Sequence, residues 1–387
     1  MRRRLIVLLI LTVGVPLGEV AAQQAVALQM VEPIQIGEPT GPLPAEARVV
    51  GEREIAALAA AQAWPAGLLD RQADHIASQA GRRLLNADRG RLTQTFLQGQ
   101  AARQRGDAVA AALKGHYALV MLDEQFQLLE ASQQTATALH AQIQRSIEIG
   151  LLSPADESLW QAESTLADLR DRQVQLQGRR DDVRRQMASR LQAPWLCSYR
   201  PADSLHPALP DGVCEQWCQD ALAQRADYQA WQQVRCRLDE TSLPEAQQLL
   251  DQLIPAWTPG VPAPSSWLRQ LTFRWAVRRS GELGQLQSQL SRAVQGLASQ
   301  ICGEVQSATQ QLQTALARVE LADQQLKQLD EQLQRVHQLA EIGQAQAADE
   351  AHWTLRRQQV LGERLVRLSE AKQAELELLR LMGHWDQ

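Results

Sequence analysis

The sequence predicts an all-α protein that contains two repeated, long, antiparallel coiled-coil hairpins and little or no β structure. Three observations lead to this prediction: the composition, long runs with a seven-residue apolar repeat, and a short pattern that occurs twice. Ala, Gln, Leu, Arg and Glu dominate the 387 residues, whereas Phe and Tyr occur only three times each. Good helix formers are abundant and β-branched and aromatic residues are scarce, which favours helices over strands.

The N-terminus predicts export from the cytoplasm. Three arginines precede an apolar run from Leu5 to Leu17, and small residues follow at Ala21 and Ala22. The apolar run is too short to cross a bilayer comfortably and is typical of a signal peptide. We therefore expect a cleaved signal over residues 1–22, with an uncleaved inner-membrane anchor as the alternative. A proline-rich stretch makes residues 23–53 an expected extended arm.

Two regions show the apolar periodicity of a coiled coil. In the first region, one row falls at intervals of seven and consists of Leu122, Leu129, Ala136 and Ile143, with Leu119 and Phe126 between its members. In the second region, the rows are Leu312, Val319, Leu326 and Leu333, and Ala322, Leu329 and Val336. Such rows predict helices of about 40 residues, the first from about Asp107 to Ile149, each roughly 60 Å long.

The first apolar region ends in a pattern that predicts a turn between helices. Gly150 follows the apolar run, where a left-handed residue ends a helix at little cost. Ser153 suits the N-cap of the next helix, Pro154 its first position, and Asp156 the third residue of a capping box. We expect a hairpin tip near residues 150–154.

The second apolar region ends in the same pattern, 193 positions later. Glu148–Trp160 and Glu341–Trp353 share Glu-Ile-Gly, then Ala-Asp-Glu, then Trp. The second copy keeps Gly343 and Asp349 but has Gln346 in the place of the serine, so its helix cap should be weaker. Two copies in two matching hairpins indicate an internal duplication, with the second tip near residues 343–347.

The duplication predicts the organisation of the chain. The first helical repeat covers residues 54–192, and a cysteine-containing connector covers 193–219. The second helical repeat covers residues 220–383 and contains a Pro- and Trp-rich insert at 240–280.

Four of the five cysteines fall in or near the connector: Cys197, Cys214, Cys218 and Cys236. Because an exported chain meets an oxidising compartment, all four are disulfide candidates. Cys214 and Cys218 lie one helical turn apart, which is a poor geometry for bonding each other. We expect Cys197 to pair with one of them. A zinc site made of Cys197, His206, Cys214 and Cys218 is the alternative, although the spacing is not that of a standard zinc finger.

The sequence carries few signs of other chemistry. Net charge is −5, and both signs are mixed along the chain, so no charged block indicates a nucleic-acid partner. Phosphate-binding loops, zinc-protease motifs and nucleophile elbows are absent from the sequence. We therefore expect neither enzyme activity nor a cofactor or catalytic metal.

The two turns, with two further segments, resemble the TolC-like outer-membrane efflux proteins. Members of that family have Gly-x-x-Ser/Thr-x-x-Asp turns, matched here by Gly150–Asp156 and less fully by Gly343–Asp349. The family's closing pattern is matched by Leu378–Gly383. Its opening pattern for the second repeat, Arg-Pro-Asp/Glu-Leu/Tyr-x-Ala, is matched by Arg225–Ala230, with Ala226 in the place of proline.

The resemblance implies a function in export. Three subunits would form a helical tunnel in the periplasm, and association with the outer membrane is left open. The hairpin tips would bind the periplasmic adaptor protein of an efflux or type I secretion complex, which also contains an inner-membrane pump. The tip residues carried over from the family are Gly150, Leu152, Ser153, Asp156, Gly343 and Asp349.

One part of the family pattern is missing from the sequence. Family members place outer-membrane β-barrel strands in windows that correspond to residues 86–106 and 240–280. Membrane strands need about 9–11 residues of alternating character, and neither window shows a convincing pair. We expect the barrel to be reduced or missing. A non-conducting periplasmic coiled-coil scaffold derived from the same family is therefore the alternative function.

Overall fold

The computed structural model describes residues 48–81, 87–150, 153, 157–210, 212–238, 282–342 and 347–386. The expected signal peptide, nearly all of the expected arm and the insert at 240–280 lie outside these residues. Helices dominate the described part of the chain, which confirms the all-α prediction. The strands in this part are the two-residue segments β1 (Val49–Val50) and β2 (Arg200–Pro201), which pair in parallel.

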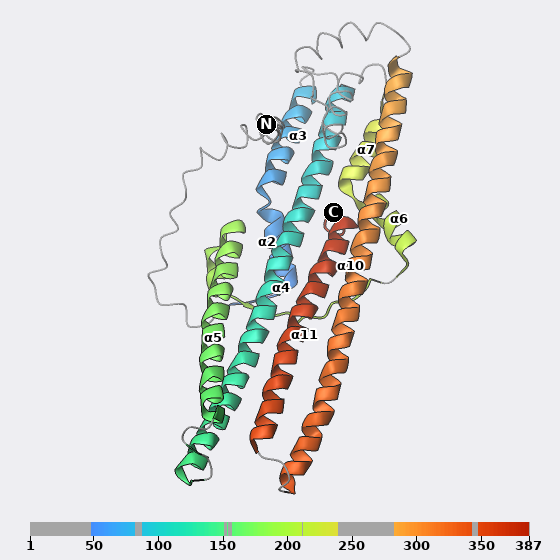
Figure 1. Ribbon diagram of the computed structural model, residues 1–387. Helices are drawn as coiled ribbons and strands as arrows, with labels where there is room; N and C mark the ends of the chain where they lie inside the picture. The colour runs from blue at the N-terminus through green and yellow to red at the C-terminus, as the bar shows by residue number, and fades with distance from the viewer. Residues whose placement is uncertain are drawn as a thin grey trace, which may run out of the picture. The chain divides into compact units, whose positions relative to one another are not determined.

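Four long helices form the two hairpins (Figure 1). The first hairpin consists of α4 (Ala87–Glu148) and α5 (Glu157–Arg190), and the second of α10 (Glu282–Glu341) and α11 (Ala347–Leu381). The 62 residues of α4 correspond to about 90 Å, which is longer than the sequence predicts. The helices α4 and α10 end 193 positions apart, so the sequence repeat is also a repeat of helix boundaries.

Side-chain contacts fix the direction in which the long helices pack. Ion pairs and hydrogen bonds join Asp123 with Arg180, Gln133 with Gln173, Asp323 with Arg364, Asp330 with Arg357, Lys114 with Glu377, and Thr135 with Gln358. For each pair of helices, one residue number rises as the other falls. The pairs α4–α5, α10–α11 and α4–α11 are therefore antiparallel. It follows that α4 and α10 run parallel, with both tips at the same end (Figure 1).

The predicted coiled-coil rows supply much of the packing between these helices. Leu122, Leu129, Ala136 and Ile143 are all buried, as the heptad spacing predicts. In the second hairpin Leu312 and Leu326 are buried, but Leu333 and Val336 are only half-buried. The apolar contact of the second hairpin therefore weakens toward its tip.

Shorter helices cover the ends of the long helices away from the tips. The N-terminal helices α2 (Glu52–Ala61) and α3 (Trp64–Gly81) pack on α4. The connector contains the 3-10 helix η1 (Pro194–Ser198) and leads into α6 (Cys214–Gln224) and α7 (Ala226–Cys236). Both α6 and α7 pack on α10, and α7 also packs on α4. This end of the molecule therefore holds most of the buried aromatic side chains.

The helix α4 begins about 20 residues before the expected start because it continues through two glycines. A Cβ atom at Gly99 would lie 2.5 Å from the Cβ of Ala230 and 2.7 Å from the carbonyl oxygen of Ala226. A Cβ at Gly106 would lie 2.3 Å from a carboxylate oxygen of Asp386. Both glycines thus permit close packing rather than ending the helix. Residues 87–106, most of the first window considered for barrel strands, are helical, and the second window is outside the described residues.

Each helix that the structure describes is either too short or too polar to pass through a lipid bilayer.

Candidate functional site

The tip of the first hairpin ends in the predicted glycine turn. The amide of Ile149 donates to the carbonyl oxygen of Arg145, and the amide of Gly150 donates to that of Ile147, both at 3.0 Å. Gly150 has a φ of +79°, the left-handed conformation that glycine adopts without strain. This backbone conformation confirms that Gly150 terminates α4.

Each tip exposes an isoleucine next to the end of its long helix. Ile149 is 71% exposed and Ile342 is 65% exposed. They occupy the same place in the repeated Glu-Ile-Gly pattern, and each follows an exposed glutamate, Glu148 or Glu341. Single exposed apolar side chains are common on proteins. What distinguishes these two is that the same arrangement recurs at both tips.

Aromatic exposure differs between the two tips. Trp160, in the first turns of α5, is 67% exposed. The equivalent Trp353 on α11 is only half-buried and lies edge-on to His352, with the ring centroids 6.4 Å apart. Of these two equivalent tryptophans, the one at the first tip is therefore the more exposed.

Histidine–glutamate contacts join the helices of each hairpin near its tip. His337 on α10 lies between two carboxylates, with Nδ1 3.2 Å from Glu350 on α11 and Nε2 3.5 Å from Glu341. In the first hairpin, His140 on α4 lies 3.7 Å from Glu163 on α5. These contacts are exposed or half-buried, and in both hairpins they lie between the two helices in the half nearer the tip.

The structure describes only some of the residues predicted for the tips. Gly150 and Ser153 are exposed at the first tip, and Asp349 is exposed in the first turn of α11. Leu152, Asp156 and Gly343 lie outside the described residues. The structure describes α5 from Glu157 on, so the capping role of Ser153 and the partner-binding role of all six residues stay predictions.

Sequence reasoning missed three of the most exposed apolar residues at the tips: Ile149, Ile342 and Trp160. A signal for them was present, because each belongs to the repeated Glu-Ile-Gly and Ala-Asp-Glu-x-x-Trp pattern. The turn residues drew attention to the backbone, whereas these side chains carry the apolar surface.

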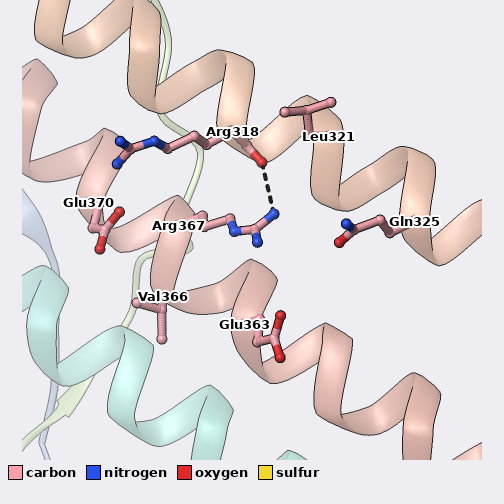
Figure 2. Close-up of a pocket in the computed structure, with 7 residues that line it drawn as sticks. All are labelled: Arg318, Leu321, Gln325, Glu363, Val366, Arg367 and Glu370. Atoms are coloured by element: carbon pink, nitrogen blue, oxygen red, sulfur yellow. Dashed lines mark hydrogen bonds between the residues drawn. The ribbon is translucent and has the colours of Figure 1, made fainter.

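A shallow groove of about 550 Å³ lies between α10 and α11, above the second tip (Figure 2). Its two apolar side chains, Leu321 and Val366, are 55% and 39% exposed. Nη1 of Arg367 donates to the carbonyl oxygen of Arg318 at 3.3 Å. Its lining residues are Arg318, Leu321, Gln325, Glu363, Val366, Arg367 and Glu370. This mixture of aliphatic and charged groups suits contact with another protein surface.

The two segments that match the family's opening and closing patterns contact each other at the far end from the tips. Arg225 binds both carboxylate oxygens of Asp227, at 3.0 and 2.7 Å. Gly383 has a φ of +75°, and a Cβ there would lie 2.9 Å from the backbone nitrogen of Arg225. The amide of Ala226 donates to Asp386 Oδ2 at 3.2 Å. The start of α7 and the C-terminus therefore form one packed junction.

Burial acts on the pKa values of two carboxyl groups in this junction, those of Asp227 and Asp386. Burial alone would raise the pKa of Asp227, but the hydrogen bonds and charge of Arg225 outweigh it and hold that pKa below its usual range. Asp386 has weaker partners, and burial raises its pKa to about 6. Asp227 thus remains charged in a structural ion pair.

The cysteines lie in three places. Cys197 is exposed on η1 and Cys236 is exposed at the end of α7, whereas Cys214 and Cys218 pack in the core beside Cys302. All five are thiols in this structure, and the pairing of Cys197 with Cys214 or Cys218 stays a prediction. Among the described residues, no group of three or more His, Cys, Asp or Glu could hold a metal ion, so the zinc alternative gains no support.

The fold of this chain is similar to that of known structures, although family models and curated proteins give no match to the sequence. Solved structures do match, and three of them are the Campylobacter jejuni outer-membrane channel CmeC, the outer-membrane channel OprN and the open state of the Neisseria gonorrhoeae outer-membrane channel MtrE.

The similarity to these channels is in structure rather than sequence. CmeC is 10% identical, with a TM-score of 0.52 over 77% of this chain and 67% of that one. OprN is 14% identical, with a TM-score of 0.52 over 77% and 73%. MtrE is 15% identical, with a TM-score of 0.50 over 76% and 72%. At such identities the similarity establishes a shared fold, and function has to be argued from the residues.

Proposed function

We propose that this chain is a subunit of a TolC-like efflux component, and that its hairpin tips bind a periplasmic adaptor protein. The observation that carries the proposal is the pair of equivalent exposed isoleucines, Ile149 and Ile342, at two tips that lie at the same end of the fold. The shared fold with outer-membrane channels supports it.

The chemistry of the tips indicates what kind of partner they would take. Each tip combines one aliphatic side chain with an adjacent carboxylate, Glu148 or Glu341. A complementary partner would offer two apolar sockets flanked by basic side chains, repeated at the spacing of the two tips. Because apolar groups that leave water on contact supply most of the binding energy, the isoleucines would contribute more than the glutamates.

A tunnel requires more than one copy of the chain. One subunit supplies two hairpins, which cannot surround a passage by themselves, so we propose a homotrimer as the assembly. The groove between α10 and α11 is our candidate contact with the neighbouring copy, since Leu321 and Val366 are exposed there. In the cell this trimer would lie in the periplasm, associated with the outer membrane, and the adaptor would connect it to an inner-membrane pump.

Photo-crosslinking from the tips would test the partner. We would place a photoreactive amino acid at Ile149 and at Ile342, with position 174 as a matched control, because Val174 is 72% exposed but lies along the shaft of α5. We expect both tip positions, but not position 174, to crosslink in cells to a protein of the periplasmic adaptor class. Adducts of equal yield at position 174, or none at either tip, would contradict adaptor binding.

The assembly is tested separately by the molar mass of residues 23–387 in light scattering and by conductance in planar bilayers. A trimer that conducts ions supports the channel role. A trimer that does not conduct would favour the scaffold alternative, and a monomer at all concentrations would exclude the tunnel.

A further inference from the structure

Three thiols meet where α6 packs on α10. Cys214 and Cys218 lie one turn apart on α6, and Cys302 lies on α10. Cys218 is buried, the other two are half-buried, and all three belong to one apolar cluster. The thiol of Cys218 donates to the carbonyl oxygen of Cys302 at 3.8 Å. Cys218 and Cys302 are thus in contact, although they lie 84 positions apart in the sequence.

The three thiols differ in reactivity. Burial raises the pKa of Cys218 to about 12, and hydrogen bonds with Cys302 and then Cys214 add to the rise. A thiol with so high a pKa is almost entirely protonated at neutral pH and is a poor first nucleophile. Cys302, like Cys214, is more accessible than Cys218, so a reaction that joins Cys218 to Cys302 would begin at Cys302.

We propose that Cys218 and Cys302 form a disulfide that joins α6 to α10. The inference rests on the proposed function in one respect, because export would bring the chain into an oxidising compartment. Cys218 is chosen over Cys214 because its sulfur lies against Cys302. Cys214 and Cys218 are on successive turns of one helix and are poorly placed to bond each other.

The oxidant is an external disulfide, such as an oxidoreductase or glutathione disulfide. The thiolate of Cys302 attacks one donor sulfur, breaks the donor S–S bond and releases one donor thiolate, which takes up a proton. Cys218 then loses its proton and attacks the Cys302 sulfur of the mixed disulfide, which releases the second donor thiolate to be protonated. Two protein thiols are oxidised and one donor disulfide is reduced to two thiols.

The link would constrain the second repeat. The closed loop contains α7 and the insert at 240–280, and it ends on the buried face of α10. A cross-link over so long a loop restricts the unfolded chain more than the folded one, and therefore raises stability. It would also keep the connector fixed on α10 while the hairpin tips bind a partner.

Peptide mapping tests the pairing directly. The purified full chain would be oxidised with glutathione disulfide, alkylated while denatured, and digested with trypsin and a protease that cuts after glutamate. Cleavage after Glu215 separates Cys214 from Cys218. We expect a disulfide between fragments 216–225 and 293–304. Alkylated Cys218 and Cys302, or a link from either to Cys197 or Cys214, would overturn the pairing.

Single substitutions provide a second readout. In the wild-type chain and in Cys214→Ser, the matched control one turn away, oxidation should raise the melting temperature by several degrees. In Cys218→Ser and Cys302→Ser the oxidised and reduced samples should melt together, with circular dichroism showing that the reduced variants are folded. An equal rise in Cys218→Ser would overturn the proposal.

Acid trapping of thiols in cells then separates the pairing from the compartment. A link between Cys218 and Cys302 in exported protein supports both. A link that forms with glutathione disulfide but is absent in cells would contradict the proposed export and leave the pairing intact.

Discussion

The first long helix of each hairpin ends at the same place in the repeat, but the two hairpins are held together by different side chains. In the first hairpin, Asp123 on α4 contacts Arg180 at 2.7 Å and Arg184 at 3.8 Å, and all three side chains are at most 20% exposed. The guanidinium of Arg180 also lies 4.7 Å from the ring centroid of Phe126. In the second hairpin, the corresponding ion pairs, Asp323 with Arg364 and Asp330 with Arg357, lie at the surface.

This difference indicates which contacts of a duplicated hairpin are needed for its fold. The buried heptad rows set the register, because a shift along the helix would expose them. Ion pairs at the rim contribute little to stability, so they can change without cost to the fold. The first hairpin has a largely buried ion-pair cluster, whereas the second has a row of more exposed pairs.

The strongest test of this comparison removes an equivalent leucine from each hairpin. Leu119 and Leu312 lie 193 positions apart, and both are 0% exposed. Leu119→Ala and Leu312→Ala should each lower the free energy of unfolding by about 2–5 kcal/mol, through lost burial and the cavity left behind. Urea denaturation followed by circular dichroism measures the loss. The exposed Leu321→Ala should cost less than about 0.5 kcal/mol. A large effect at only one of the two buried positions would mean that Leu119 and Leu312 are not equivalent core positions of the two repeats.

A smaller effect is expected from the ion pairs. Asp123→Asn should lower the free energy of unfolding by about 1–2 kcal/mol, because it removes the carboxylate that Arg180 contacts at 2.7 Å in a largely buried position. Asp330→Asn should cost about 0.5 kcal/mol or less, since its partner remains in water. Both variants would be compared in the same urea titration. Equal losses would show that burial does not distinguish the two hairpins.

The smallest effect concerns the contact between the hairpins. Glu377 on α11 accepts from Lys114 on α4 at 2.6 Å and from Arg380, whose hydrogen bond is the largest cause that lowers the pKa of Glu377 to about 2. A lowered carboxyl pKa stabilises the fold above the ordinary value of 4.5, and that stability is lost as the pH falls toward 2.

The wild-type chain should therefore lose more stability between pH 5 and pH 2 than Glu377→Gln, by about 1 kcal/mol after allowance for solvent screening. Thermal melts of both proteins across this range give the difference. Parallel pH profiles would show that Glu377 does not stabilise the contact between α4 and α11.

The local features of the fold were predictable from the sequence, and the distant contacts were not. Leu122, Leu129, Ala136 and Ile143 are buried as predicted because helical periodicity alone decides which face is covered. Gly150 adopts the predicted left-handed turn for an equally local reason. The predicted start of α4 near Asp107 is about 20 residues too late, because the apolar rows mark only the coiled-coil part of the helix, whereas residues 87–106 pack on α7 and the C-terminus instead.

The candidate sites divide in the same way. The tips could be located from the repeated pattern, but the exposure of Ile149 and Ile342 depends on nothing in the described chain covering them. Cys302 carries no local signal that relates it to Cys218, since the contact exists only after α6 packs on α10. The roles of Leu152, Asp156 and Gly343 stay predictions.

The hydrogen bond from the amide of Ala226 to Asp386 restricts which residues position 226 can accept. Ala226 stands where the resembling family has proline, and proline has no amide hydrogen to donate. The carboxylate of Asp386 is almost fully buried beside Gly106, so it depends on the donors available at this junction. A proline at position 226 would remove this donor and leave a buried carboxylate short of a hydrogen bond. Proline is therefore disfavoured at position 226 as long as position 386 carries a carboxylate.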